Sequence, residues 1–479
     1  MSPTDSHLLH NRRPAMLMVA LFLAGLFPAV SGSAAESPNI ILIMADDLGY
    51  GDVGCYGQQR IRTPNIDRLA AEGLRFTQFY AGSTVCAPSR CALMTGRHIG
   101  HCRVRGNAGR KNPASQALRD SDVTLAEVLK SAGYATGLIG KWGLGDIGPA
   151  ETGLPRRQGF DEFFGYLNQS HAHNYYPTFL WRNETKVPLK NIVPNEGSVG
   201  NGMSSNKVDY SADLIATEAL AFVRNHREKP FLLCWTPTIP HANNEARKQG
   251  MEVPDYGEYA DLDWPEPQKG HAAMISRLDR DIGRLLALLR ELQLDDRTLV
   301  LFTSDNGPHR EGGNNPDFNK SSGRLRGIKR AMYEGGIRVP MIVRWPGHVP
   351  TGKVSDQVWA AWDLLPTFAE LAEGKPPAEI DGLSFAPTLL GKPQPRTHAY
   401  LYWEFYEGGF KQAVRWEDWK GVQPGKGKPI ELYDLKTDLA EQNNLAKSHP
   451  ELVKKAQELM TAAHEENPDW PVKSAKKPG

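Results

Sequence analysis

The stretch that decides the fold is NIILIMADD, residues 39–47. An apolar run from Ile40 to Ala45 ends at two adjacent acids, Asp46 and Asp47. A strand that is apolar throughout is buried on both faces, as in a parallel sheet between layers of helices. Polar residues that follow such strands gather at one edge of the sheet and form the binding site there. The stretch therefore predicts an α/β fold with a functional site at its strand ends.

Comparable apolar runs recur along the chain, and several also lead into polar residues. They lie at 136–140, 231–235, 299–303 and 340–344; the first three lead into Lys141, Pro240-His241 and Asp305-Asn306. Between them, residues 122–132 and 271–293 show helical spacing, and the second segment is amphipathic. Alternating strands and helices predict an α/β sandwich around a large, mostly parallel sheet.

The C-terminal part has a different pattern. Short strand-like runs at 398–405, 411–414, 419–422 and 431–433 precede a helical segment at 450–465. They predict a smaller antiparallel sheet with a terminal helix. We expect a catalytic domain at 36–393, a C-terminal subdomain at 394–470 and a disordered tail at 471–479. Segments 148–210 and 241–270, rich in Pro, Gly, Asn and aromatic residues, are expected to be long loops over the site.

The N-terminus and the composition bound the class of protein. Arg12 and Arg13 precede an apolar run at 15–30 and small residues at 31–35, the order of a secretory signal peptide. Residues 1–35 are thus expected to direct export to the periplasm or the medium, with an uncleaved anchor as the alternative.

The 479 residues hold 56 Lys and Arg against 55 Asp and Glu. This balance gives no general reason to bind nucleic acid.

The acidic pairs predict a metal site. Asp46 and Asp47 repel each other unless a cation lies between them, and Asp305-Asn306 supplies more oxygen ligands. Oxygen ligands without cysteine or histidine partners suit a hard cation, calcium or magnesium. The chain has five cysteines but no CxxC spacing, which makes a thiolate zinc site a poor match.

Positively charged side chains are expected around this metal. Arg90, Lys141, His241 and Lys329 each follow a strand end or a turn rich in Gly or Pro. Fixed positive charge beside a divalent cation needs an anion to balance it. A tetrahedral oxyanion ester, either sulfate or phosphate, is the expected occupant.

The segment TVCAPSRCALMTGRHIG, residues 84–100, contains Cys86-Ala87-Pro88-Ser89-Arg90, followed by Thr95-Gly96-Arg97. It resembles the C-x-P-x-R signature of the type I, formylglycine-dependent sulfatases of the alkaline-phosphatase-like superfamily. The similarity extends over nearly the whole mature chain, through Pro38-Asn39-Ile40 to Asp47, Gly140-Lys141-Trp142, Pro240-His241, Ser304 to Gly307, Lys329 with Tyr333 to Gly336, and Leu432 to Leu435. It implies an alkaline-phosphatase-like fold.

The resemblance also implies a chemistry. In that family a maturation enzyme oxidises the cysteine to Cα-formylglycine, whose hydrate attacks sulfur and forms a covalent sulfate intermediate. Its second hydroxyl then releases the sulfate. Carried over by residue, the implied calcium ligands are Asp46, Asp47, Asp305, Asn306 and modified Cys86. Arg90 would steady the formylglycine, Lys141, Lys329 and His241 would hold the sulfate, and His241 with Lys329 would protonate the leaving oxygen.

One position departs from the family pattern. The family usually reads G-K-W-H-L-G, whereas this chain has Gly143 in place of the histidine, which normally assists the elimination step. His171 and His173 follow downstream, and we hypothesise that one of them enters the pocket and replaces it or contacts the substrate. The alternative is an ordinary pair of loop histidines.

The substrate is less determined than the reaction. Residues 166–173 resemble the corresponding segment of exo-acting carbohydrate sulfatases from bacteria that degrade polysaccharides. His309, Arg338 and Glu404 are further candidate sugar contacts. We expect a sulfated galactose or N-acetylgalactosamine. A phosphoester hydrolase of the same superfamily and a non-catalytic sulfated-glycan binder remain the alternatives, and the sequence leaves sulfate position, endo or exo action, disulfide pairing and oligomeric state open.

Overall fold

The computed structural model describes residues 37–108 and 112–472. The expected signal peptide and nearly all of the expected tail lie outside the described residues. The described residues form one compact unit. Across the described ranges, no helix has both the length and the apolar character that a membrane crossing needs.

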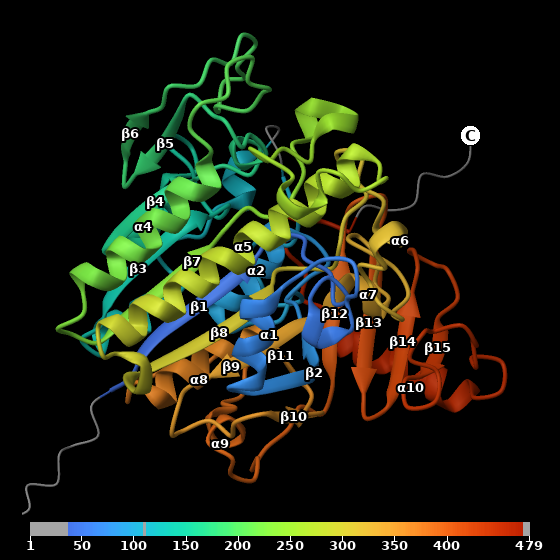
Figure 1. Cartoon of the computed structure of the whole chain (residues 1–479). Coiled ribbons are helices and arrows are strands. Elements are labelled where there is room, and N and C mark those ends of the chain that lie inside the picture. The colour runs from blue at the N-terminus through green and yellow to red at the C-terminus, as the bar shows by residue number, and fades with distance from the viewer. Residues whose placement is uncertain (1–36, 109–111, 473–479) are drawn as a thin grey trace, which may run out of the picture. The chain divides into compact units, whose positions relative to one another are not determined.

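The centre of the molecule is an eleven-stranded sheet (Figure 1). Its strand order is β10-β2-β9-β8-β1-β7-β3-β4-β5-β6, and β11 pairs with β2 beside this path. The strands are β1 Asn39–Ala45, β2 Leu74–Tyr80, β3 Ala135–Lys141, β4 Glu162–Tyr166, β5 Phe179–Arg182, β6 Thr185–Pro188, β7 Phe231–Thr236, β8 Thr298–Ser304, β9 Arg338–Arg344, β10 Lys353–Ser355 and β11 Trp359–Ala360.

The middle of the sheet is parallel, as predicted. β1 pairs in parallel with both β7 and β8, and β3 pairs in parallel with β7 and β4. β9 differs from the expectation because it runs antiparallel to β8 and β2. The residues of β9 are buried on both faces of the sheet, and they would be buried whichever way the strand ran. An apolar run therefore cannot reveal the direction of the strand.

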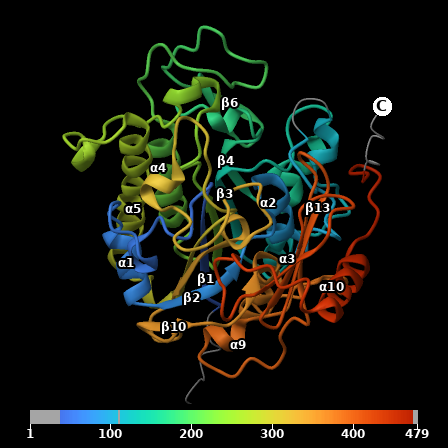
Figure 2. The same cartoon turned by 90° about the vertical axis from the view of Figure 1, so that its right-hand side faces the viewer.

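Helices cover both faces of this sheet. The α-helices of the described residues are α1 Pro64–Ala71, α2 Cys86–Thr95, α3 Leu125–Ser131, α4 Ser211–Asn225, α5 Glu266–Glu291, α6 Pro316–Asn319, α7 Glu334–Ile337, α8 Leu364–Leu371, α9 Ala386–Leu389 and α10 Pro450–Ala463. The last of them, α10, packs on the smaller C-terminal sheet. Figure 2 shows α1, α4 and α5 on one side and α2 and α3 on the other. Alternate residues of β1 enter two cores: Ile41 and Ile43 face the first helix group, and Ile40 and Leu42 the second.

The helix ends follow from local chemistry. The helix expected at 122–132 begins at Leu125, because Thr124 caps it: its hydroxyl accepts from the Glu127 amide, and the Glu127 carboxylate accepts from the Thr124 amide. The helix expected at 271–293 begins earlier, at Glu266, directly after Pro265. That first turn is polar, so the apolar repeat did not include it.

The segment 148–210 is more ordered than expected. It contains β4, which pairs in parallel with β3, and the hairpin of β5 and β6 at the sheet edge. Between β4 and β5 lies a single short helical turn, His171–His173. The long-loop prediction was therefore wrong for the stretches that form β4, β5 and β6.

The C-terminal prediction is confirmed in its elements. β12 Leu401–Phe405, β13 Lys411–Trp416, β14 Trp419–Gln423 and β15 Glu431–Asp434 form a four-stranded antiparallel sheet, followed by α10. This sheet lies beside the main one (Figure 1) and shares a hydrophobic cluster with it. The Trp403 indole N–H, for example, donates to the Ala81 carbonyl at 2.9 Å. The domain boundary at residue 393 stays a prediction.

Candidate active site

Four neighbouring strands deliver the predicted polar residues to one edge of the sheet. Asp46 and Asp47 follow β1, and Asp305 and Asn306 follow β8, its neighbour. Lys141 is the last residue of β3, and His241 lies five residues past the end of β7. All of them are buried, as is Cys86 at the first position of α2.

The acidic pairs contact each other directly. The Asp47 amide donates to Asp305 Oδ1 at 3.1 Å, and Asn306 Nδ2 donates to Asp47 Oδ1 at 2.7 Å. Asp47 itself has a positive φ of 65°, which turns the chain sharply at the end of the strand. The Cys86 thiol lies 3.3 Å from Asp46 Oδ1. The predicted metal ligands therefore form one cluster.

Three cations hold these carboxylates. Lys141 Nζ lies 2.7 Å from Asp46 Oδ2, and Lys329 Nζ lies 2.7 Å from Asp47 Oδ2. Arg90 donates through Nε and Nη2 to Asp305 Oδ2, at 3.2 and 2.9 Å, and through Nη1 to the carbonyl of Lys141 at 2.6 Å. Arg90 thus orients both a carboxylate and a lysine, and its side chain is 1% exposed.

The positive and negative charges shift one another's pKa values. Burial alone would raise the pKa of Asp46 and Asp47, but Lys141 beside the first and Lys329 beside the second hold both values below the usual range. Burial and the charge of Asp46 raise the pKa of Asp305 to about 7. Three carboxyl groups therefore share one buried site with the three cations Lys141, Lys329 and Arg90.

This donor set fits a hard divalent cation. Besides the three carboxylates, Asn306 Oδ1 is buried and has no hydrogen-bond partner within the described part of the chain. An amide oxygen left without a donor is a natural cation ligand, and carboxylate plus amide oxygens are the set that calcium or magnesium prefers. Asp46, Asp47, Asp305 and Asn306 would hold the ion.

His241 has a defined tautomer. Its Nδ1 lies 2.7 Å from the Ala242 carbonyl, which can only accept, so Nδ1 carries the hydrogen. Nε2 then accepts from Lys329 Nζ at 3.2 Å. Burial and the charge of Lys329 lower the pKa of His241 to about 3, and the ring is neutral near neutral pH. Lys329 and His241 form one proton-carrying pair.

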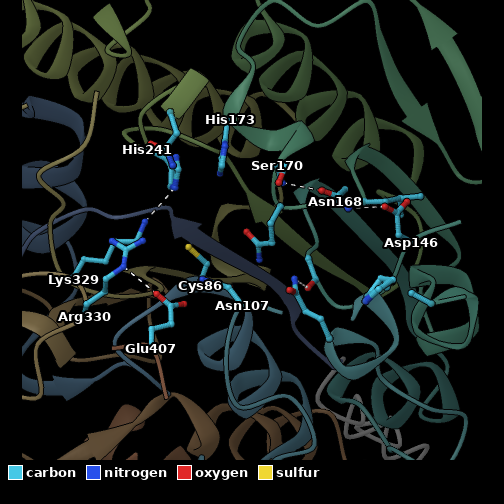
Figure 3. Close-up of a pocket in the computed structure, with 18 residues that line it drawn as sticks. Cys86, Asn107, Asp146, Asn168, Ser170, His173, His241, Lys329, Arg330 and Glu407 are labelled. Atoms are coloured by element: carbon cyan, nitrogen blue, oxygen red, sulfur yellow. Dashed lines mark hydrogen bonds and ion pairs between the residues drawn. The ribbon is translucent and has the colours of Figure 1, made fainter. Parts of the chain in front are cut away.

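A pocket of about 210 Å³ opens above this cluster. Cys86, His241 and Lys329 line one side of it (Figure 3). The other lining residues are Asn107, Pro113, Gln116, Gly143, Gly145, Asp146, Ala150, Leu167, Asn168, Gln169, Ser170, His173, Asn244, Arg330 and Glu407. Most of these carry amide, carboxylate, hydroxyl or cationic groups.

One of the two loop histidines reaches the pocket. His173 lines it and stacks on His241, with ring centroids 5.0 Å apart and planes 11° apart. Its Nδ1 lies 3.2 Å from Glu245 Oε2. His171 instead is fully buried, and its Nε2 lies 3.1 Å from the Phe179 carbonyl. His171 therefore cannot take the role that we expected for it.

Three other expected sugar contacts lie outside the set of described residues that line the pocket. His309 is buried beside His241, and its ring nitrogens engage the Pro240 carbonyl and the Glu311 amide, each at 3.0 Å. Arg338 donates to Glu334 at 3.1 Å and lines a different cavity. Glu404 is buried against Arg105 at 3.0 Å and His464 at 2.7 Å. The polar groups of all three are held by other protein groups outside this pocket.

Sequence reasoning missed most of the pocket wall. Arg330 follows Lys329 directly, and it bridges Glu311 and Glu407 at 2.6 and 3.1 Å. Asp146 follows the Gly140–Gly145 motif closely. Both positions adjoin a recognised motif, which is a usable signal. Asn107 and Glu407 stand in loops without any motif.

Comparisons with known proteins agree with this geometry. The sulfatase family pattern matches residues 38–375, and that of the N-sulphoglucosamine sulphohydrolase C-terminal region matches residues 328–466. N-acetylgalactosamine-6-O-sulfatase of Bacteroides thetaiotaomicron is 33% identical over 90% of this chain and 94% of its own length. Steryl-sulfatase of Mus musculus is 34% identical over 86% of this chain and 75% of its own.

Solved structures extend the comparison to the fold. A structure described as part of glycosaminoglycan metabolism in Bacteroides thetaiotaomicron superposes with a TM-score of 0.75 at 29% identity, covering 89% of this chain and 99% of its own. Ps i-CgsB superposes with a TM-score of 0.76 at 29% identity, covering 92% and 96%. The fold is alkaline-phosphatase-like, and the chain belongs to the sulfatase family of sulfuric ester hydrolases.

Proposed function

We propose that this sulfatase is exported and removes sulfate from a sulfated carbohydrate, using a Cα-formylglycine that a maturation enzyme makes from Cys86. The observation that carries the proposal is the position of Cys86. Its side chain stands between the carboxylate cluster and the pocket, 3.3 Å from Asp46 and beside Lys329 and His241.

The electrostatics of Cys86 favour conversion over direct use of the thiol. Burial and the charge of Asp46 raise the pKa of the Cys86 thiol well above its usual value. A protonated thiol is a poor nucleophile, because the thiolate is the reactive form. Oxidation to an aldehyde and hydration to a gem-diol replace it with two hydroxyl groups at the same position.

The reaction balances with one water. One hydroxyl of the gem-diol releases its proton to water as its oxygen bonds to sulfur, the bond from sulfur to the sugar oxygen breaks, and that oxygen takes a proton from the Lys329–His241 pair. The second hydroxyl then returns a proton to this pair, the bond from carbon to the sulfate oxygen breaks, and sulfate leaves as the aldehyde reforms. Water adds to the aldehyde and restores the gem-diol. A divalent ion on the acidic cluster would offset negative charge at the reacting sulfate.

The protein's own residues orient these groups. Arg90 fixes Asp305 and the backbone at Lys141, and Lys141 stays paired with Asp46 beneath the pocket. Lys329 lies within hydrogen-bond reach of both Asp47 and His241, so it can hold a sulfate oxygen and supply a proton. The first residues of α2 add the partial positive charge of a helix N-terminus near Cys86.

The pocket wall supports a sugar substrate. Asn107, Gln116, Asp146, Asn168 and Glu407 offer donors and acceptors suited to sugar hydroxyls. Bacteroides N-acetylgalactosamine-6-O-sulfatase is a relative over most of both chains. We therefore propose a sulfated galactose or N-acetylgalactosamine as the substrate.

A substrate panel tests this proposal. The chain is produced with a maturation enzyme, and release of sulfate from sulfated monosaccharides, an aryl sulfate, a steryl sulfate and phosphate monoesters is measured. We expect turnover of a galacto-configured sugar sulfate above all others. Preference for the aryl or steryl sulfate overturns the substrate assignment, and preference for phosphate overturns the reaction. Formylglycine present without any turnover favours a glycan-binding protein.

A further inference from the structure

The space beside Gly143 is filled by another side chain. Gly143 has a φ of +82°, and a Cβ built on it would lie 2.2 Å from Nε2 of Gln169. A histidine at position 143, as in the usual family pattern, would need that space for its side chain. In this chain the amide of Gln169 occupies it, so the glycine and the glutamine form a matched pair.

Gln169 lines the candidate active-site pocket. It follows β4 in the loop that also carries Asn168 and Ser170, and all three line the same pocket as Cys86. The carbonyl of Gly143 is already engaged by Gln116 Nε2 at 2.9 Å. The Gln169 amide is therefore not needed to donate a hydrogen bond to the Gly143 carbonyl.

The amide of Gln169 is incompletely satisfied. Its Nε2 is buried and has no hydrogen-bond partner among the residues that the structure describes. A buried donor without a partner is energetically unfavourable, so such an atom at a pocket wall points to a missing acceptor. A half-turn about the Cγ–Cδ bond exchanges the amide oxygen and nitrogen, so an anion in the pocket can select the orientation that presents the NH₂ group.

We propose that Gln169 replaces the missing family histidine as a substrate contact, donating a hydrogen bond to a sulfate oxygen of the bound ester. This inference rests on the proposed sulfatase site at Cys86. A carboxamide does not titrate near neutral pH, so Gln169 binds and orients the sulfate and carries no proton. Proton transfer stays with Lys329 and His241.

Three variants of Gln169 separate hydrogen bonding from space filling. Gln169→Met keeps the length and volume but removes the amide, Gln169→Ala removes both, and Gln169→Glu brings a negative charge toward the sulfate. We expect the Met and Ala variants to lose about 10- to 100-fold in kcat/KM, the range for one hydrogen bond to a charged group. Gln169→Glu should lose more. Gln457→Ala, on the exposed face of α10, is the matched control.

A second readout does not depend on turnover. Binding of inorganic sulfate to each unmatured protein, with Cys86 still a thiol, is measured by calorimetry alongside the melting temperature. We expect the Met variant to bind sulfate about 10-fold more weakly or worse, with an unchanged melting temperature. Wild-type affinity for sulfate in the Met variant overturns the inference. If wild-type protein turns over no sulfate ester, the proposed function fails, while the binding comparison still decides the role of Gln169.

Discussion

At the scale of single residues, Cys86 and Cys91 provide a matched pair. Both are buried in α2, but only Cys86 of the two lines the pocket and contacts Asp46. We expect Cys86→Ala to abolish turnover, a loss of at least about 1,000-fold, because the nucleophile is removed. Cys91→Ala should keep turnover. Mass spectrometry of the peptide spanning residues 84–97 should show a loss of about 18 Da at position 86 in wild type and in Cys91→Ala. Turnover by Cys86→Ala would contradict the mechanism.

The residue scale also shows what a sequence can reveal about a site. The acidic pairs, Lys141 and His241 could be placed because each follows an apolar strand, and strands in one sheet end at one edge. His171 and His173 could not be told apart, since a short helical turn directs one ring into the core and the other toward the pocket. Gln169 carried no signal at all. Its role depends on the absence of a side chain at position 143, which lies in the loop that follows β3.

At the scale of elements, the junction between α7 and the C-terminal sheet depends on a buried ion cluster. Lys420 of β14 lies 2.9 Å from Glu334 at the start of α7 and 3.0 Å from Glu441, and all three side chains are buried. Lys420→Met removes the cation that joins the two carboxylates: Glu334 keeps Arg338 at 3.1 Å, whereas Glu441 is left with the Glu334 amide at 2.7 Å. We expect a loss of about 3–5 kcal/mol in the free energy of unfolding at pH 8, measured by denaturant titration. Arg182→Met, which breaks an exposed pair with Glu218, should cost no more than about 1 kcal/mol.

The pH dependence of this element follows from the same charges. Burial and the charge of Glu334 raise the pKa of Glu441 to about 7, although Lys420 opposes the shift. A carboxyl whose folded pKa lies above its unfolded value binds a proton on folding, and stability falls as pH rises through the interval between the two. Without the positive charge of Lys420, the pKa of Glu441 in the folded chain rises further, and this interval extends to higher pH. The penalty of Lys420→Met should therefore be largest above pH 7 and smaller at pH 5, and a penalty independent of pH would contradict the assignment.

At the scale of the whole molecule, the sheet was predictable because its central strands are continuous apolar runs. The direction of β9 and the strands β4 to β6 were not, since direction and edge pairing depend on contacts far along the chain. The same long-range assembly creates the acidic cluster. Asp46 and Asp305 are 259 positions apart in sequence, and their carboxylates meet only in the folded chain. Folding therefore assembles the oxygen cluster that would hold a cation, which the unfolded chain lacks.

This linkage predicts that a divalent cation stabilises the whole fold. An ion that binds only the folded chain adds about 2.7 kcal/mol at a concentration 100 times its dissociation constant. We expect calcium or magnesium to raise the melting temperature of chelator-treated protein by a few degrees, measured by calorimetry. Asn306→Ala should abolish most of this shift, because it removes the buried amide oxygen that has no partner within the described ranges. Asn315→Ala, which removes only the side-chain cap of α6, should keep the full shift. An equal shift in both variants would place the ion elsewhere.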